Sequence, residues 1–206
     1  MKLITVNTPF MDVNTYLLES DMGAIIIDPA QMTDEIKLFI KENANKEIAL
    51  LLTHSHFDHI MGAAEVKRLS GCKVYVGAAD AEGLINPELN LSERFCINCE
   101  PVEGDCLLED NDEITIGDIK AKVMHTPGHS KGSVCFIVGD WMFSGDTLFR
   151  MSVGRTDFIG GDKSEQNATL KRLCEINGDY DVYPGHGPAT RLSFERTYNP
   201  YIKEIL

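Results

Sequence analysis

A dense group of potential metal ligands follows an apolar run near the first quarter of the chain. Within six positions the sequence places His54, His56, Asp58 and His59, directly after the apolar residues 48–52. Burying several neutral imidazoles beside a carboxylate costs free energy unless each polar group finds a partner. A divalent cation is such a partner, because neutral imidazole suits zinc, iron and similar metals. We therefore predict a metal centre here; the alternative is a solvated, histidine-rich turn.

The backbone expected around these residues divides them into two sets. Residues 48–52 predict a strand buried on both faces, and apolar residues recur with helical spacing from residue 60. Side chains two positions apart in extended backbone leave on the same side, so His54 and His56 are expected to face one ion. Asp58 and His59 lie beyond the bend and point elsewhere, which suggests a second ion.

Three more ligand-type residues stand just beyond later strands. They are His129, Asp146 and His186, which follow strands predicted at residues 119–124, 141–144 and 182–183. Each lies next to a glycine, which lets the backbone approach closely. Four strand ends at one rim of the molecule would bring all these side chains to a single site.

The remaining pattern predicts two groups of strands with helices outside them. Strands are also expected at residues 1–6, 14–19, 23–28, 73–76, 113–116 and 133–138, and helices at 33–43, 60–70, 78–86, 164–176 and in the tail 189–206. Residues 86–109 predict a long loop. We expect an α/β (α+β) fold, with sheet packed on sheet, in one domain of 206 residues.

Composition narrows the classes of partner. The formal net charge of −13 argues against nucleic acid and anionic membranes as partners, since both require clustered Lys and Arg. No apolar run is long enough for a membrane span, and the start of the chain lacks the features of a signal peptide, so a cytoplasmic location is expected. The six cysteines are scattered along the chain, and we expect them to be reduced thiols. The alternative for Cys96 and Cys99 is half of a structural zinc site or a redox pair.

Four motifs taken together resemble the metallo-β-lactamase fold superfamily. They are His54-x-His56-x-Asp58-His59, Thr126-Pro-Gly-His129, Ser144-Gly-Asp146-Thr and Pro184-Gly-His186-Gly. The resemblance spans roughly residues 1–190 and implies a four-layer αββα sandwich of two mixed β-sheets flanked by helices. Within the superfamily, Asp146-Thr-Leu-Phe followed by Gly154-Arg-Thr-Asp is most similar to glyoxalase II (hydroxyacylglutathione hydrolase) and its short bacterial relatives.

The resemblance implies a role for each candidate ligand. His54, His56 and His129 match the ligands of a first metal ion, Asp58, His59 and His186 those of a second, and Asp146 the carboxylate that bridges both. His125 matches a residue that is common in the family and is not a ligand. Two divalent ions are expected, zinc in the first instance, with iron or manganese as alternatives.

The activity implied is hydrolysis of a thioester such as S-lactoylglutathione by a hydroxide held between two metal ions. Asp58 is assigned a catalytic role as well, because it can orient this nucleophile. A small anionic acyl thioester is the expected substrate, and Arg150, Arg155 and Lys131 are candidates to meet it, with plain surface charge as the alternative. Phe149, Phe158 and the 86–109 loop are candidate pocket walls.

Two questions stay open at this point. Asp28, Thr53 and Asn14 are candidates to orient imidazole rings, with ordinary strand-end capping as the alternative. The chain is expected to lack the full C-terminal helical region of glyoxalase II, which leaves glutathione specificity undecided. Other activities compatible with the motifs are those of a mononuclear iron persulfide dioxygenase and of a lactone or β-lactam hydrolase.

Overall fold

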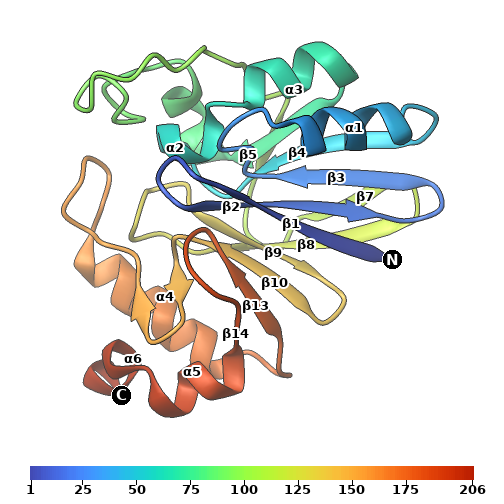
Figure 1. The fold of residues 1–206 in the computed structure, drawn as a ribbon. Coiled ribbons are helices and arrows are strands. Elements are labelled where there is room, and N and C mark those ends of the chain that lie inside the picture. Colours follow the sequence, from blue (N-terminus) through green and yellow to red (C-terminus); the bar gives the residue numbers. More distant parts are fainter.

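Two six-stranded sheets packed face to face form the centre of the computed structural model, which describes residues 1–206 (Figure 1). The first sheet has the order β1-β2-β3-β4-β5-β6. Its strands are β1 (Lys2–Thr8), β2 (Val13–Glu19), β3 (Gly23–Ile27), β4 (Glu47–Leu52), β5 (Lys73–Gly77) and β6 (Cys106–Leu108). The pairs β1–β2 and β2–β3 are antiparallel, and the pairs from β3 to β6 are parallel.

The second sheet has the order β14-β13-β10-β9-β8-β7. It contains β7 (Glu113–Ile116), β8 (Ile119–His125), β9 (Val134–Val138), β10 (Trp141–Gly145), β13 (Asp181–Pro184) and β14 (Thr190–Arg191). Only β10 and β13 pair in parallel. Two short strands, β11 (Leu148–Phe149) and β12 (Ser152–Val153), form a separate hairpin. Both main sheets are therefore mixed, as expected.

Helices cover the two outer faces of this sandwich and complete its four layers (Figure 1). On the side of the first sheet lie α1 (Asp34–Glu42), α2 (Phe57–Ile60), α3 (Ala63–Ser70) and the 3-10 helix η1 (Ala78–Leu84), and on the other side lie α4 (Lys163–Glu175), α5 (Leu192–Tyr198) and α6 (Pro200–Ile205). Thr33 and Asp162 cap α1 and α4 by accepting hydrogen bonds from backbone N–H groups. None of these helices is both long and apolar enough to cross a membrane.

Strand β4 shows how the layers are joined. Because side chains alternate along a strand, Leu50 and Leu52 face the helices and pack with residues of α1 and α3. Ala49 and Leu51 point the other way, into the core between the two sheets, where they join Phe136 and Phe143. All four β4 residues are fully buried, as a strand covered on both faces requires.

Three local predictions were wrong. The single helix expected at residues 60–70 is divided into α2 and α3, because the Gly62 N–H donates to the Pro29 carbonyl oxygen at 2.7 Å instead of to a carbonyl of the preceding helical turn. The helix expected at 78–86 is the shorter 3-10 helix η1. Part of the predicted 86–109 loop forms β6, a three-residue edge strand too short to show a periodic pattern.

Truncating the core between the sheets should destabilise the whole sandwich. The Phe143 ring is fully buried and stacks on Tyr183 with 5.4 Å between ring centroids. We expect Phe143→Ala to lower the free energy of unfolding by about 3–5 kcal/mol, measured by urea denaturation. Leu38→Ala, on the exposed side of α1, is the control and should change it by less than about 0.5 kcal/mol. A loss below about 1 kcal/mol for Phe143→Ala would contradict this account of the core.

Candidate metal centre

The seven predicted ligands meet at one rim of the sandwich, beside α2 in Figure 1. The first sheet and the segment that follows β4 supply His54, His56, Asp58 and His59. The second sheet supplies His129 between β8 and β9, Asp146 after β10, and His186 after β13. His125 stands apart, since its Nε2 lies 2.8 Å from the Lys131 carbonyl oxygen.

The ligand atoms form two triads with one carboxylate between them. Those of His54, His56 and His129 lie within 4.8 Å of one another, and so do those of Asp58, His59 and His186. Each triad thus draws side chains from both sheets. Asp146 lies between the triads: its Oδ1 is 3.3 Å from His59 Nε2, and its Oδ2 is 3.5 Å from His129 Nε2.

These separations suit ligands that share a cation. Tetrahedral zinc with bonds of about 2.0–2.1 Å holds its ligand atoms about 3.4 Å apart. His186 Nε2 lies 3.4 Å from Asp58 Oδ2 and 3.6 Å from Asp146 Oδ2. The spacing is too long for strong hydrogen bonds between these atoms and fits one ion among them.

Buried atoms without partners point to the same conclusion. Seven buried side-chain nitrogen or oxygen atoms of the structure have no hydrogen-bond partner, and five of them belong to this cluster. The five are Nε2 of His54, His56, His59 and His129, and Oδ1 of Asp146. Buried polar atoms almost always have a partner, so a cluster of exceptions requires an explanation. Imidazole and carboxylate donors suit divalent zinc, iron or manganese, and the residues therefore fit two such ions.

Hydrogen bonds on the far side of each ring aim these nitrogens inward. His59 Nδ1 donates to Asp28 Oδ2 at 3.0 Å, and His129 Nδ1 donates to the Arg155 carbonyl at 2.8 Å. The Thr53 hydroxyl donates to Asp28 and lies 3.1 Å from His54 Nδ1, so its oxygen accepts from that ring. Three rings thus carry their proton on Nδ1, which leaves the Nε2 lone pair free for a metal ion.

Of the three residues considered for orienting imidazoles, Asp28 and Thr53 do so directly. Asn14 acts differently. Its Nδ2 donates to the carbonyl oxygens of Pro184 and Gly187, at 3.0 and 2.8 Å, and so holds the turn that carries His186 rather than a ring. The turn is also close-packed, because a side chain at Gly185 would meet both Asp146 and His59.

The two triads differ in their electrostatics. Burial, followed by neighbouring imidazoles, lowers the pKa of His54 well below its usual value, and burial with His129 lowers the pKa of His56 to about 3. Burial also disfavours charge on His59, but Asp146 and Asp58 outweigh it and raise the pKa of His59. The pKa of His186 is raised in the same way, against burial, by Asp58 and Asp146. In the absence of metal, protons therefore favour the Asp58 triad.

The structure adds one residue that sequence reasoning missed. Asp80 of η1 is buried, and its carboxylate accepts hydrogen bonds from Ser55 N at 2.9 Å, Ser130 Oγ at 2.7 Å and Gly132 N at 2.7 Å. Ser55 lies between two predicted ligands, and Ser130 follows a third. Asp80 therefore ties the two histidine-bearing loops together. No local motif marks it, because its partners come from distant parts of the chain.

A cavity of about 450 Å³ opens directly above the two triads. Five predicted ligands form its polar part, and Phe149, Phe158 and residues of the 86–109 segment form walls, as predicted. The apolar lining consists of Met11, Phe57, Leu91, Phe95, Phe149, Val153 and Phe158. Arg155 also lines this cavity, whereas Arg150 and Lys131 do not.

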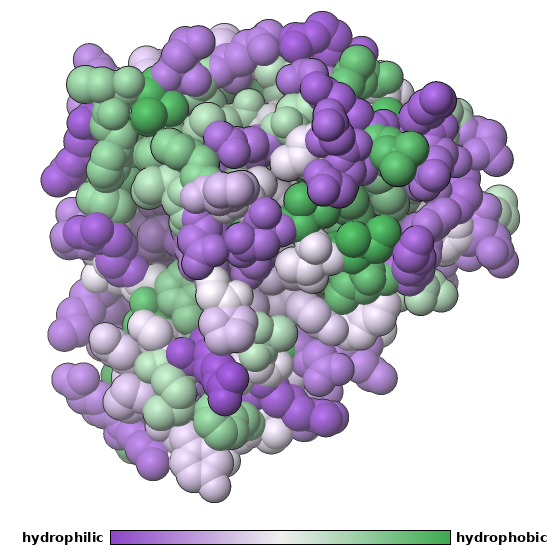
Figure 2. Space-filling view, in the orientation of Figure 1, coloured by the Kyte–Doolittle hydropathy of each residue, from purple (hydrophilic) through white to green (hydrophobic).

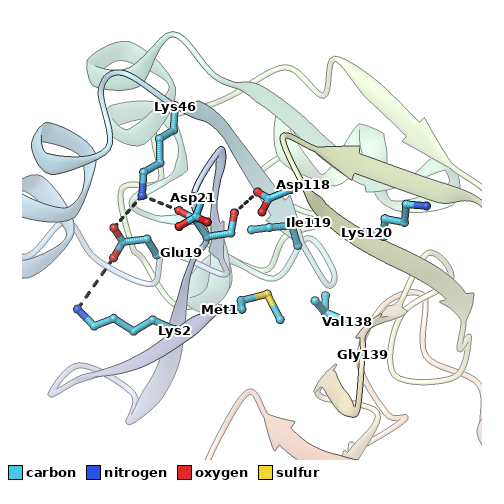
Figure 3. Close-up of a pocket in the computed structure, with 11 residues that line it drawn as sticks. Met1, Lys2, Glu19, Asp21, Lys46, Asp118, Ile119, Lys120, Val138 and Gly139 are labelled. Carbon is cyan, nitrogen blue, oxygen red and sulfur yellow. Dashed lines mark hydrogen bonds and ion pairs between the residues drawn. The ribbon is translucent and has the colours of Figure 1, made fainter.

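A larger surface hollow of about 780 Å³ lies at the opposite ends of the strands (Figure 3). Several of its charged groups already have partners: Lys46 Nζ lies 2.8 Å from Glu19 Oε1, and Asp118 accepts a hydrogen bond from Ser20. It contains no histidine or cysteine, and no buried polar atom there lacks a partner. Size alone therefore does not mark the site, and we place the chemistry in the smaller cavity.

Known proteins resemble this chain in sequence and in fold. The family model described as the metallo-beta-lactamase superfamily matches residues 8–186. The B3 metallo-beta-lactamase BLEG-1 has 33% sequence identity and a TM-score of 0.89, over 98% of this chain and 99% of that one. TTHA1623 in a di-iron-bound form has 33% identity and a TM-score of 0.85, over 96% and 99%. The hydroxyacylglutathione hydrolase GloC of Haemophilus influenzae is 28% identical over 95% of this chain and 94% of its own length.

Removing the Asp80 carboxylate should loosen the metal centre without removing a ligand. In Asp80→Asn an amide nitrogen replaces one oxygen and cannot accept a hydrogen bond, so the bond from either Ser55 N or Gly132 N is lost. We expect metal affinity to fall by about tenfold or more, measured by competition with a chelator. Asp105→Asn is the matched control, since Asp105 also accepts from a backbone N–H but lies outside the site. Equal affinities for the two variants would contradict a tethering role.

Acid should empty the two triads in sequence. A proton and a metal ion compete for the same Nε2 atom. Because the pKa values of His59 and His186 are raised, protons should displace the ion of the Asp58 triad at a higher pH than the ion of the His54 triad. His54 and His56, with lowered pKa values, stay neutral in acid and keep their ion. We expect elemental analysis after dialysis between about pH 8 and about pH 5 to show two ions per chain, then one. Simultaneous loss of both ions would contradict the difference between the triads.

Proposed function

Because the chain belongs to the metallo-beta-lactamase superfamily, we propose that it is a hydrolase that cleaves thioesters with two divalent metal ions, zinc in the first instance. The observation that carries this proposal is the pair of complete triads joined by Asp146, with five buried ligand atoms that have no other partner. The similarity to GloC supports a hydroxyacyl thioester as substrate, and the similarity to the di-iron form of TTHA1623 supports two ions.

The residues divide the work of such a reaction between them. Two cations held by the triads would supply hydroxide at neutral pH, because a metal ion lowers the pKa of its water to about 7. Asp58 reaches the floor of the cavity, and its pKa is lowered, against burial, chiefly by His59. Its carboxylate is therefore ionised, and it can accept a hydrogen bond from the nucleophile and orient it towards the carbonyl carbon.

The leaving group is also suggested by the lining of the cavity. Apart from the predicted ligands, Arg155 is the only lining residue with an ionisable side chain, and a guanidinium does not give up its proton near neutral pH. The cavity thus offers no free general acid. A thiolate, with a conjugate-acid pKa of about 8.5, leaves without one, whereas an amine or alkoxide must be protonated. This favours a thioester over an amide or ester bond.

Hydrolysis of a β-lactam is a second candidate, favoured by the structural similarity to BLEG-1. The same triads would serve both reactions, so the two candidates differ in the group held above the metal centre. An iron persulfide dioxygenase needs only one metal ion. The completeness of the Asp58, His59 and His186 triad argues for the two-ion reactions.

The proposal predicts metal-dependent release of free thiol. Protein loaded with zinc, iron or manganese should hydrolyse S-lactoylglutathione or a related hydroxyacyl thioester, followed with a thiol reagent, and a chelator should abolish the activity. Asp58→Asn should lower kcat by about 10²-fold or more at matched metal content, and Asp21→Asn on the exposed far edge should not.

Three results would decide against the proposal. With both sites filled, no thiol release from any thioester would refute it. Faster opening of a β-lactam than of a thioester would favour the second candidate. Oxygen uptake with a persulfide, at one iron per chain, would favour a dioxygenase.

A further inference from the structure

We propose that the substrate places an apolar group of aromatic size above the metal centre, and that Phe95 determines this specificity. This inference rests on the proposed thioester hydrolysis and narrows its substrate class. It favours a thioester that bears a benzyl-like group over one whose enclosed part is small and hydrophilic, such as lactoyl.

Three phenylalanines from separate parts of the chain make one continuous wall. Phe57 begins α2, Phe95 lies between η1 and β6, and Phe158 lies between β12 and α4. The ring centroids of Phe57 and Phe95 are 5.4 Å apart, and those of Phe95 and Phe158 are 6.2 Å apart and nearly perpendicular. Phe158 in turn meets the ring of the predicted ligand His56 at 6.0 Å. The apolar wall therefore begins at the metal centre itself.

The cavity offers little to hydrogen-bond a hydrophilic group. Its polar lining consists of five predicted metal ligands and Arg155. The Arg155 guanidinium already makes two hydrogen bonds to Asp157, at 2.6 and 2.7 Å, and lies 3.9 Å above the Phe158 ring. No hydroxyl or amide side chain lines the space. A substrate hydroxyl enclosed there would lose its water and gain no side-chain partner outside the metal centre.

Phe95 and Met11 leave apolar surface open to solvent beside the cavity that they line. The Phe95 side chain is 44% exposed, although it stands against two other aromatic rings. Met11, which also lines the cavity, is 45% exposed and has a left-handed backbone with a φ of 61°. Hydrophobic surface gathers over the segment that follows η1, at the upper left of the space-filling view (Figure 2). An apolar ligand in the cavity would cover such surface and be stabilised by doing so.

A panel of four thioesters tests the proposal with the metal-loaded, full-length protein. It combines an acetyl or phenylacetyl group with a 2-mercaptoethanol or phenylmethanethiol leaving group, and S-lactoylglutathione is the hydrophilic reference. Each kcat/KM is divided by the rate of hydrolysis of the same compound in hydroxide, which removes differences in intrinsic reactivity. The doubly small compound carries both the acetyl group and 2-mercaptoethanol. We expect the normalised kcat/KM of at least one benzyl-bearing compound to exceed that of the doubly small one by about tenfold or more. The panel also shows whether the acyl or the thiol side enters the cavity.

Variants of Phe95 show whether its ring is responsible. Phe95→Ala should reduce the ratio of kcat/KM for the preferred and the doubly small compound by about tenfold, and Phe95→Leu should keep part of that ratio. Leu38→Ala, an exposed apolar residue of α1 far from the cavity, should leave the ratio unchanged. An equal loss for all compounds in Phe95→Ala would overturn the assignment of Phe95.

A binding measurement separates this inference from the proposed function. By calorimetry on the metal-loaded protein, phenylacetate should bind about tenfold more tightly than acetate, and Phe95→Ala should remove most of the difference. If no thioester is hydrolysed but this difference is found, the proposed function fails and the apolar site stands. If thioesters are hydrolysed but S-lactoylglutathione is preferred, or the two carboxylates bind alike, the apolar specificity is refuted.

Discussion

The structure depends on a set of buried polar atoms that the protein alone does not satisfy. Four imidazole nitrogens and one carboxylate oxygen are removed from water and left without hydrogen bonds at the junction of the two sheets. In an ordinary core this arrangement would cost several kcal/mol, since each unpaired polar group loses about 1–3 kcal/mol. It persists because the rings are held from behind by Asp28, Thr53 and the Arg155 carbonyl. The protein thus keeps the site organised for cations.

The surroundings of the centre divide into a polar floor and an apolar wall. The floor consists of predicted metal ligands, and the Asp80 carboxylate connects two of the loops that carry them. Above them, the wall is made of phenylalanines carried by segments with little regular structure. This division places reactivity at the ends of packed strands, and it leaves recognition to loop segments that can change without disturbing the sandwich. A long segment such as residues 86–105 therefore suits a role in choosing the substrate.

Sequence reasoning reached the parts of the molecule whose causes are local. The metal-binding character of the turn from His54 to His59 was evident from its density of ligand-type residues. The burial of residues 49–52 followed from an unbroken apolar run, although Ile48, at its start, is only half-buried. The bridging position of Asp146 came from resemblance to a family, because spacing does not show which distant strand ends meet. Asp80, β6 and the break at Gly62 were missed for a related reason. Each depends on a contact between distant segments, which periodicity and propensity do not record.

Both triads draw side chains from both sheets, and this has a mechanical consequence. His129 and His186 follow strands of the second sheet, while the other ligands of each triad follow β4 of the first sheet. Each bound cation would therefore cross-link the two sheets at the edge of the sandwich. Because the ions bind the folded chain and not the unfolded one, their binding free energy adds to the free energy of unfolding. Loss of the metal ions would then lower the stability of the folded chain as well as its activity.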